Sequence, residues 1–285
     1  MKLLVTGATG MLGSKMMDIL GASHEGYGTS PQKSEGVFPA EITHPKEIFA
    51  LVQELQPDAI VHCAAYTAVD ACEEFPELAH AVNGQGTRNV ALAAESVGAE
   101  VFYISTDYVF DGEKEGPYVE DDSTNPTSVY GKSKLEGERA VQEVCSKWYI
   151  GRTQWLYGEG GTNFAQTIIR LGRERESLKV VDDQHGSPTY TKDLAYEVKS
   201  ILEAKAYGLY HLSNEGKTTW YGFAREILDH ANVQVDLQPC TSEEFPRTAK
   251  RPKNSVLQNK SLDKMLGNSM RSWQLALEDY VTRSQ

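Results

Sequence analysis

The sequence has little cysteine, no excess of positive charge and no long apolar run. Its 285 residues include four cysteines, and none of them forms a Cys-x-x-Cys pair, which argues against a zinc site or a disulfide framework. We interpret them as reduced thiols used as small core residues. No run of about 18 apolar residues predicts a transmembrane helix, and no signal-peptide pattern opens the chain. We therefore expect a cytoplasmic protein.

Acidic residues outnumber basic ones, 40 to 28, which gives a net charge of −12. This balance excludes a general nucleic-acid binder, which needs clustered positive charge, and it excludes a polybasic membrane anchor. Hydrophobic residues make up 40 % of the chain and charged residues 24 %, so a substantial core is expected. The length suits one large domain, or a main domain with a smaller lobe.

Strand and helix patterns alternate through the first half of the chain. Short apolar runs predict strands over 2–6, 25–29, 59–62, 101–105 and 148–152. Helical patterns lie between them over 11–20, 45–55, 76–97 and 129–145. Strands separated by helices of this length predict a parallel sheet with right-handed crossovers.

We therefore predict an α/β protein with a Rossmann-type doubly wound parallel sheet. Residues 1–150 are expected to form an NAD(P)-binding domain. After about residue 150 the elements become shorter and the loops carry glycine and proline. Residues 151–285 are expected to form a smaller C-terminal substrate-binding lobe, interleaved with further sheet elements.

A glycine-rich loop follows the first predicted strand. The segment Gly7-Ala8-Thr9-Gly10-Met11-Leu12-Gly13 has the spacing G-x-x-G-x-x-G. Glycine permits a tight strand-to-helix turn and a close approach to a pyrophosphate. The N-terminus of the following helix then offers free N–H groups to that anion. The loop predicts a dinucleotide site.

The end of the second predicted strand bears on the choice of cofactor. NAD enzymes usually place an acidic residue here to bind the ribose 2′-hydroxyl, but the segment Tyr27–Lys33 contains none. Thr29, Ser30 and Lys33 could hold a 2′-phosphate instead. We expect NADPH as the preferred cofactor, with NADH as the alternative.

Tyr130 and Lys134 are four residues apart at the start of a predicted helix, so they share a helix face. A free phenol has a pKa near 10, and a neighbouring ammonium lowers it. The tyrosine can then exchange a proton with a substrate oxygen. Upstream, a predicted strand ends in Ser105-Thr106, where α/β active sites open. Thr106 could hydrogen-bond the reacting oxygen, or Ser105 could do so instead.

These segments resemble the extended short-chain dehydrogenase/reductases. The resemblance rests on Gly7–Gly13, on Ser105–Gly112 and on Tyr130–Lys134. Further segments resemble the dTDP-4-dehydrorhamnose reductase family within that group, over 63–70, 152–158, 182–189, 251–252 and 254–255. Together they span almost the whole chain.

The resemblance implies reduction of the 4-keto group of dTDP-6-deoxy-L-lyxo-4-hexulose to dTDP-L-rhamnose. Tyr130 would be the proton donor and Thr106 would polarise the keto oxygen. Lys134 would bind the nicotinamide ribose and lower the pKa of the tyrosine. Other contacts are implied by position: Gly10, Met11 and Leu12 at the pyrophosphate, Glu41 and Ile42 near the adenine, Ala64, Ala65 and Tyr66 along the cofactor, Thr67 near the nicotinamide ribose, and Asp107 and Trp155 at the sugar nucleotide.

Two departures from related families narrow the expectation. The nucleotide-sugar 4,6-dehydratases have glutamate after the aspartate, whereas Tyr108 follows Asp107 here, which favours reduction over dehydration. Some relatives dimerise around Mg²⁺ through carboxylates, one of them on the first helix, where this chain has Lys15. We therefore expect no bound metal, and a monomer or a homodimer.

A basic loop follows Glu244, with four cations and no acidic residue over 245–255. Arg251 is the candidate contact for the diphosphate of a dTDP-sugar, because guanidinium binds oxyanions in two-point fashion. Two alternatives to a reductase stay open. One is a nucleotide-sugar epimerase of the same family. The other is a non-catalytic NADP-binding subunit of the kind that regulates methionine adenosyltransferase.

Overall fold

The computed structural model describes residues 1–32 and 34–284. Its centre is a parallel seven-stranded sheet in the order β3-β2-β1-β4-β5-β6-β11. The strands are β1 (Lys2–Thr6), β2 (Glu25–Ser30), β3 (Val37–Pro39), β4 (Ala59–His62), β5 (Glu100–Thr106), β6 (Trp148–Thr153) and β11 (Gly208–His211). The strand order reverses between β1 and β4, and ligands of such sheets bind beyond the strand ends at that point. The predicted doubly wound fold is confirmed.

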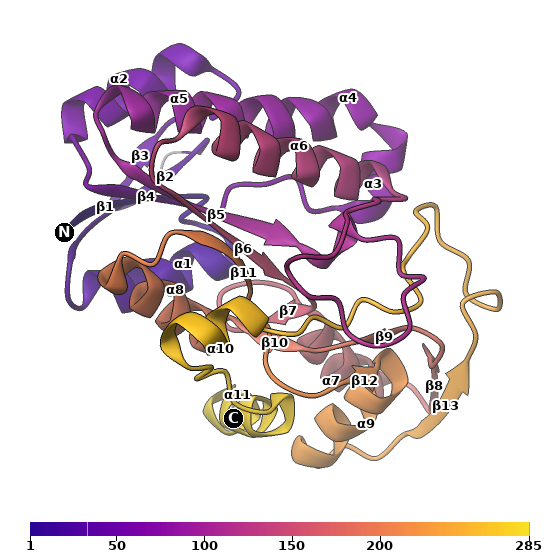
Figure 1. The fold of residues 1–285 in the computed structure, drawn as a ribbon. Coiled ribbons are helices and arrows are strands. Elements are labelled where there is room, and N and C mark those ends of the chain that lie inside the picture. Colours follow the sequence, from indigo (N-terminus) through magenta and orange to yellow (C-terminus); the bar gives the residue numbers. More distant parts are fainter. Residues whose placement is uncertain (33, 285) are drawn as a thin grey trace.

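Helices cover both faces of the sheet (Figure 1). One face carries α2 (Pro45–Leu55), α5 (Thr87–Ser96) and α6 (Val129–Val144). The other carries α1 (Met11–Gly21), α8 (Thr191–Ala204) and α10 (Lys260–Leu266). Because both faces are covered, consecutive residues of β1 are buried, and Leu3, Leu4 and Val5 have no exposed surface. Strand β11 and helix α8 come from the second half of the chain, so that half contributes to the central layer.

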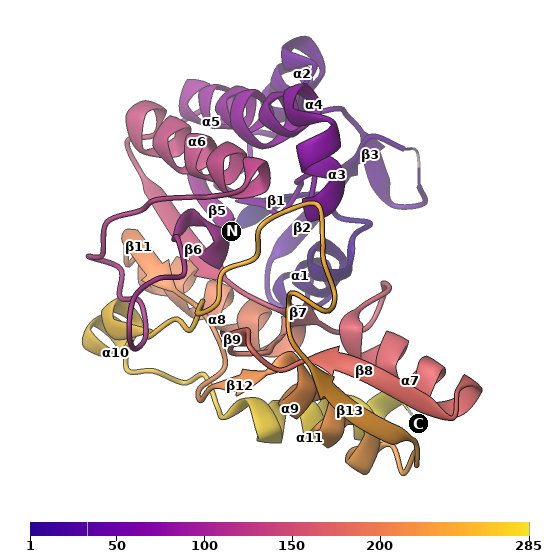
Figure 2. The same ribbon diagram turned by 90° about the vertical axis from the view of Figure 1, so that its right-hand side faces the viewer.

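The remaining elements gather beside the sheet into a second hydrophobic core (Figure 2). Its helices are α7 (Phe164–Glu174), α9 (Trp220–His230) and α11 (Trp273–Ser284). Three short strand pairs complete it: β7 (Leu156–Tyr157) with β10 (Thr189–Tyr190), β9 (His185–Gly186) with β12 (Thr218–Thr219), and β8 (Ser177–Val181) with β13 (Asp236–Cys240). None of these pairs was predicted from the sequence.

The prediction of a single α-helix over 76–97 is wrong in its middle. The segment begins with α4 (Pro76–Ala79) and ends with α5, but His80–Gly86 between these two helices is π-helical. A short helix, α3 (Val69–Glu74), precedes the segment. Two glycines in this segment bring it close to its neighbours. A Cβ on Gly84 would lie 2.7 Å from a Glu136 oxygen of α6, and one on Gly86 would lie 2.9 Å from Ile42. Such π-helical turns often mark functional sites.

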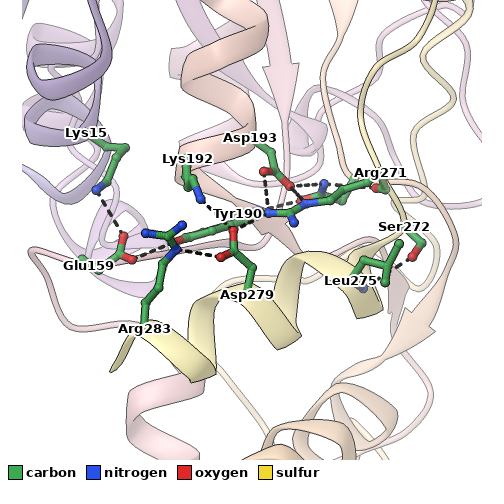
Figure 3. Close-up of polar contacts among 11 residues, drawn as sticks. Lys15, Glu159, Tyr190, Lys192, Asp193, Arg271, Ser272, Leu275, Asp279 and Arg283 are labelled. Carbon is green, nitrogen blue, oxygen red and sulfur yellow. Dashed lines mark hydrogen bonds and ion pairs between the residues drawn. The ribbon is translucent and has the colours of Figure 1, made fainter. Parts of the chain in front are cut away.

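Polar contacts and ion pairs lie where α1, α8 and α11 approach one another (Figure 3). Lys15 of α1 lies 3.4 Å from Glu159, which also accepts a hydrogen bond from the Tyr190 hydroxyl at 2.6 Å. Asp279 of α11 accepts hydrogen bonds from three cations, Lys192 (2.8 Å), Arg271 (2.8 Å) and Arg283 (2.6 Å). The first group links α1 to the residues just before α8, and the second links α8 to α11. Within 1–32 and 34–284 no helix has the length and apolarity needed to cross a membrane.

Candidate active site

A cavity of about 730 Å³ opens at the carboxyl ends of β1, β4, β5 and β6. The predicted site residues that line it are Gly7, Gly10, Met11, Leu12, Gly13, Thr29, Ser30, Glu41, Ile42, Ala64, Ala65, Tyr66, Thr67, Thr106, Asp107, Tyr130, Lys134, Trp155 and Arg251. Lys33 lies outside the described residues. A second hollow, about 740 Å³ and widely open, lies at the opposite edge near Lys2 and Gln56 and contains none of the predicted residues. The predicted site residues that the structure describes therefore gather at the first cavity.

The glycine loop forms one end of the cavity and leaves no room for a side chain at Gly7 or Gly13. Gly7 has φ +66°, and a Cβ there would lie 2.8 Å from the Ala64 nitrogen. A Cβ on Gly13 would lie 2.0 Å from the Gly7 carbonyl oxygen. The Gly10 N-cap of α1 receives no side-chain hydrogen bond, so no side chain competes for the N–H groups of the first turn. Free N–H groups at a helix N-terminus can bind an anion such as a pyrophosphate.

Thr29 and Ser30 line the cavity, but their hydroxyl groups are engaged. Thr29 Oγ1 donates to the Phe38 carbonyl at 2.9 Å, and Ser30 Oγ donates to the Gln32 carbonyl at 2.8 Å. Either hydroxyl would have to leave its carbonyl before it could donate to a phosphate. The Glu41 carboxylate similarly accepts from the Thr43 N–H at 3.2 Å. Ile42 is buried, as are Thr29 and Ser30.

The loop after β4 is fixed by a residue that the sequence did not reveal. Asn83 accepts a hydrogen bond from the Tyr66 N–H at 2.8 Å, and its amide donates to the Tyr66 carbonyl and to Ser133 Oγ. Asn83 is fully buried in the π-helical segment. It joins the loop that carries Ala64–Thr67 to the helix that carries Tyr130. An asparagine beside two glycines in an alanine-rich helix is the signal that could have drawn attention to it.

Tyr130 and Lys134 lie on the first turns of α6. Ser128 begins this helix, and its hydroxyl accepts from the Gly131 N–H at 3.1 Å. Lys134 Nζ donates to the Ile104 carbonyl at 2.7 Å. Burial lowers the pKa of Lys134 to about 7, against the opposing effects of Glu138 and Cys63. Burial also raises the pKa of Tyr130 above its usual range, although a hydrogen bond with Thr106 opposes the rise. At neutral pH the phenol therefore holds its proton.

Thr106, not Ser105, bears a hydroxyl directed toward this centre. Ser105 Oγ donates to the Glu138 carboxylate at 2.6 Å in the protein interior. Thr106 Oγ1 donates to Asp107 at 2.9 Å and accepts from the Tyr108 N–H at 3.2 Å. Burial raises the pKa of Asp107 to about 6, against the lowering effect of hydrogen bonds with Ser255 and Thr106. Of the two hydroxyls weighed from the sequence, that of Thr106 forms a hydrogen bond with Tyr130, whereas that of Ser105 is bonded to Glu138.

The second half of the chain supplies the other wall. Trp155 lies two residues beyond Thr153, which pairs with Thr106 across the sheet. Arg251 donates to Asp70 at 2.9 Å and to the Tyr108 hydroxyl at 3.0 Å. Arg251, the candidate phosphate ligand, thus lines the cavity, and its two terminal nitrogens are bonded to Asp70 and Tyr108.

Lys15 lies away from the cavity, paired with Glu159 and with Asp18 at 3.6 Å. Within the described ranges 1–32 and 34–284, no three His, Cys, Asp or Glu side chains cluster closely enough to hold a metal.

Fold and site together define a Rossmann-type protein of the extended short-chain dehydrogenase/reductase class. Within that class the chain belongs to the family of the RmlD substrate binding domain, whose profile matches residues 1–285. A dTDP-4-dehydrorhamnose reductase of Streptomyces griseus is 42 % identical over 287 residues, which cover 97 % of this chain and 91 % of that protein.

Solved structures agree with the family. The crystal structure of a dTDP-4-dehydrorhamnose reductase from Clostridium acetobutylicum has a TM-score of 0.95 and 46 % identity, with all of both chains covered. The dTDP-4-dehydrorhamnose reductase of Bacillus anthracis, solved in complex with NADP, has a TM-score of 0.94 and 41 % identity. That match covers 99 % of this chain and 100 % of the other.

Proposed function

We propose that this protein is an NADPH-dependent 4-keto reductase of a nucleotide sugar. It converts dTDP-6-deoxy-L-lyxo-4-hexulose to dTDP-L-rhamnose. The observation that carries the proposal is one cavity with a glycine-lined loop at one end and the Thr106–Tyr130–Lys134 group on its floor. The dTDP-4-dehydrorhamnose reductases that match nearly the whole chain support the same activity.

The residues present fit a dinucleotide. The loop beside β1 has no room for a Cβ at Gly7 or Gly13, so these two positions let the backbone fold tightly next to the ligand. The N–H groups of the first turn of α1 would hold the pyrophosphate, and Ala64–Thr67 would lie along the rest of the cofactor. Relief of the Lys134–Ile104 contact would free the ammonium for a ribose hydroxyl. The reduced nicotinamide, when bound, supplies a hydride to the sugar C4.

Residues of this chain supply the proton for the keto oxygen and stabilise the negative charge that develops on it. Tyr130 carries its proton at neutral pH, because burial raises its pKa, and it donates that proton to the keto oxygen as the oxygen becomes an alkoxide. A charged Lys134 lowers the pKa of the phenol as the proton leaves. Thr106 donates a second hydrogen bond to the same oxygen, after its hydroxyl turns away from Asp107. Two donors aimed at one developing negative charge are the main electrostatic contribution.

The opposite wall holds the sugar nucleotide. Arg251 would bind its diphosphate, and Asp107 and Trp155 would contact the sugar. The absence of a second acid after Asp107 favours simple reduction. We further propose that the protein acts in the cytoplasm, without nucleic-acid or membrane partners, as a monomer or homodimer. The net charge of −12 supports the exclusion of nucleic acid.

NADPH oxidation distinguishes the three candidate functions. The purified protein is mixed with NADPH, or with NADH, and with dTDP-4-keto-6-deoxy-sugar produced in place by the preceding enzymes. A reductase consumes one NADPH for each sugar reduced, and we expect NADH to be slower. An epimerase would recycle its cofactor. A regulatory subunit would bind NADPH and leave its absorbance unchanged, and either of these results would contradict the proposal.

A further inference from the structure

Trp155 has an unusual backbone conformation. Its φ is +46°, in the left-handed region that bulky residues rarely adopt. Within 1–32 and 34–284, three other non-glycine residues share a positive φ, and two of them, Gln56 and Lys205, end helices. The third, Asn232, is of a type that tolerates this region. Trp155 lies at no helix end and faces the cavity. Strain of this kind persists only where surrounding contacts enforce it, and it is frequent at functional sites.

Trp220 supplies the first of these contacts. Its indole stacks on that of Trp155 with ring centroids 3.6 Å apart and an interplanar angle of 12°. Phe164 of α7 packs on Trp220 at 4.7 Å, which links the pair to the second hydrophobic core. Trp220 is the first residue of α9, and Thr219 before it caps that helix by accepting from the Gly222 N–H at 3.0 Å. Both tryptophans line the cavity.

Gly186 supplies the second contact. A Cβ at this position would lie 2.4 to 2.8 Å from three atoms of the Trp155 indole, so only glycine leaves the ring its place. Gly186 pairs with Thr218 in the β9–β12 ladder. The same two-strand unit therefore places both Gly186 and Trp220 against Trp155. The Thr189 N–H also donates to the Trp155 carbonyl at 3.2 Å, which holds the strained backbone.

We propose that Trp220 is a positioning residue and that Gly186 is its counterpart, so that the β9–β12 unit holds Trp155 as a rigid wall against the hexose of the sugar nucleotide. The proposal rests on the proposed function for the identity of the ligand. When the aromatic surface is already ordered in the free protein, binding does not have to supply the free energy of ordering that side chain. Neither Trp220 nor Gly186 touches the reacting atoms in this arrangement. Both act through Trp155.

Binding of dTDP-L-rhamnose, measured by calorimetry, tests the proposal without turnover. We expect Trp220→Ala and Gly186→Ala each to weaken binding about tenfold, the size of one well-packed aromatic contact. Trp220→Phe keeps an aromatic ring in place and should bind within about threefold of wild type. NADPH affinity should not change in these variants. Trp148→Phe, which alters a tryptophan outside the cavity, is the matched control.

Circular dichroism reports the stack itself, because two stacked indoles give an exciton couplet. The couplet should be present in wild type and in Trp148→Phe and should be lost in Gly186→Ala, which retains all four tryptophans. Wild-type sugar-nucleotide affinity in a Gly186→Ala protein that has lost the couplet would overturn the proposal. So would an equal loss of NADPH affinity. If Trp220→Ala does not fold, the binding measurements on Gly186→Ala and Trp220→Phe still test the proposal. A wild type that binds dTDP-L-rhamnose but never oxidises NADPH would refute the proposed function and leave this test standing.

Discussion

The two sides of the cavity are built in different ways. The proposed cofactor side lies at the ends of β1, β4 and β5 and on the first turns of α1 and α6, with buried strands beneath it. The proposed sugar side draws on loops, short strands and the first turns of α3 and α9, joined by side chains far apart in the sequence, such as Trp155 with Trp220 and Arg251 with Asp70. A rigid scaffold fixes the chemistry, and loops that can vary set the substrate.

The largest effect is expected on the cofactor side. Tyr130→Phe removes the proton donor and should lower kcat by about a thousandfold, a typical value for a general acid. NADPH affinity should stay close to wild type, because the ring and its packing against Tyr108 remain. Steady-state kinetics and a cofactor titration make the measurement. Turnover near the wild-type rate would exclude Tyr130 as the donor.

Gly13→Ala tests the backbone cradle on the same side. The added Cβ would lie 2.0 Å from the Gly7 carbonyl oxygen, so the loop must move and NADPH affinity should fall by about a hundredfold. Gly21→Ala is the control, because that glycine ends the same helix and has open space around it. Equal cofactor affinities in the two variants would show that the loop does not hold the pyrophosphate.

A smaller effect is expected on the sugar side. Arg251→Met should raise the KM for the sugar nucleotide about tenfold or more, the usual value of a charge-assisted hydrogen bond, while the KM for NADPH stays unchanged. Lys250→Met provides the comparison, since that side chain is exposed and lies 3.6 Å from Glu113. If both variants raise the KM for the sugar nucleotide equally, the loop acts through its overall charge and Arg251 makes no specific contact with the diphosphate.

The smallest effect concerns pH. Burial lowers the pKa of Lys134 to about 7 in the free protein, so its positive charge is present below that pH and is lost above it. NADPH affinity relative to Lys134→Met should therefore fall a few-fold as pH rises through 7. The same shift means that folding releases a proton, so this group makes stability rise with pH between about 7 and its unfolded value near 10.4. If the ratio of wild-type to Lys134→Met affinity for NADPH does not change as pH rises through 7, Lys134 keeps its charge.

The sequence was most informative where structure is local. The predicted bounds 45–55 and 59–62 match α2 and β4, and the spacing of Tyr130 and Lys134 placed both on one helix face. Each of these features depends on neighbours within a turn or a strand. The two short strands β9 and β12 escaped prediction, because a two-residue strand has no hydrophobic period to detect.

The residues missed at the site depend on distant partners. Asn83 acts through Tyr66, 17 positions away, and Trp220 acts through Trp155 and Gly186 in other segments. Thr29 and Ser30 were predicted from their position alone, and their hydroxyl groups turned out to bond nearby carbonyls. The division into two domains at about residue 150 stays a prediction. Strand β11 and helix α8 lie after that residue and complete the central layer.

Isotope transfer tests the proposed activity most directly. NADPH carrying deuterium at its transferable C4 position is incubated with the protein and the 4-keto sugar nucleotide, and the product is examined by mass spectrometry and NMR. We predict one deuterium per product molecule, located at the sugar C4, with one NADP⁺ formed for each. Product without deuterium at C4, or NADPH left unconsumed, would contradict the assignment as a 4-keto reductase.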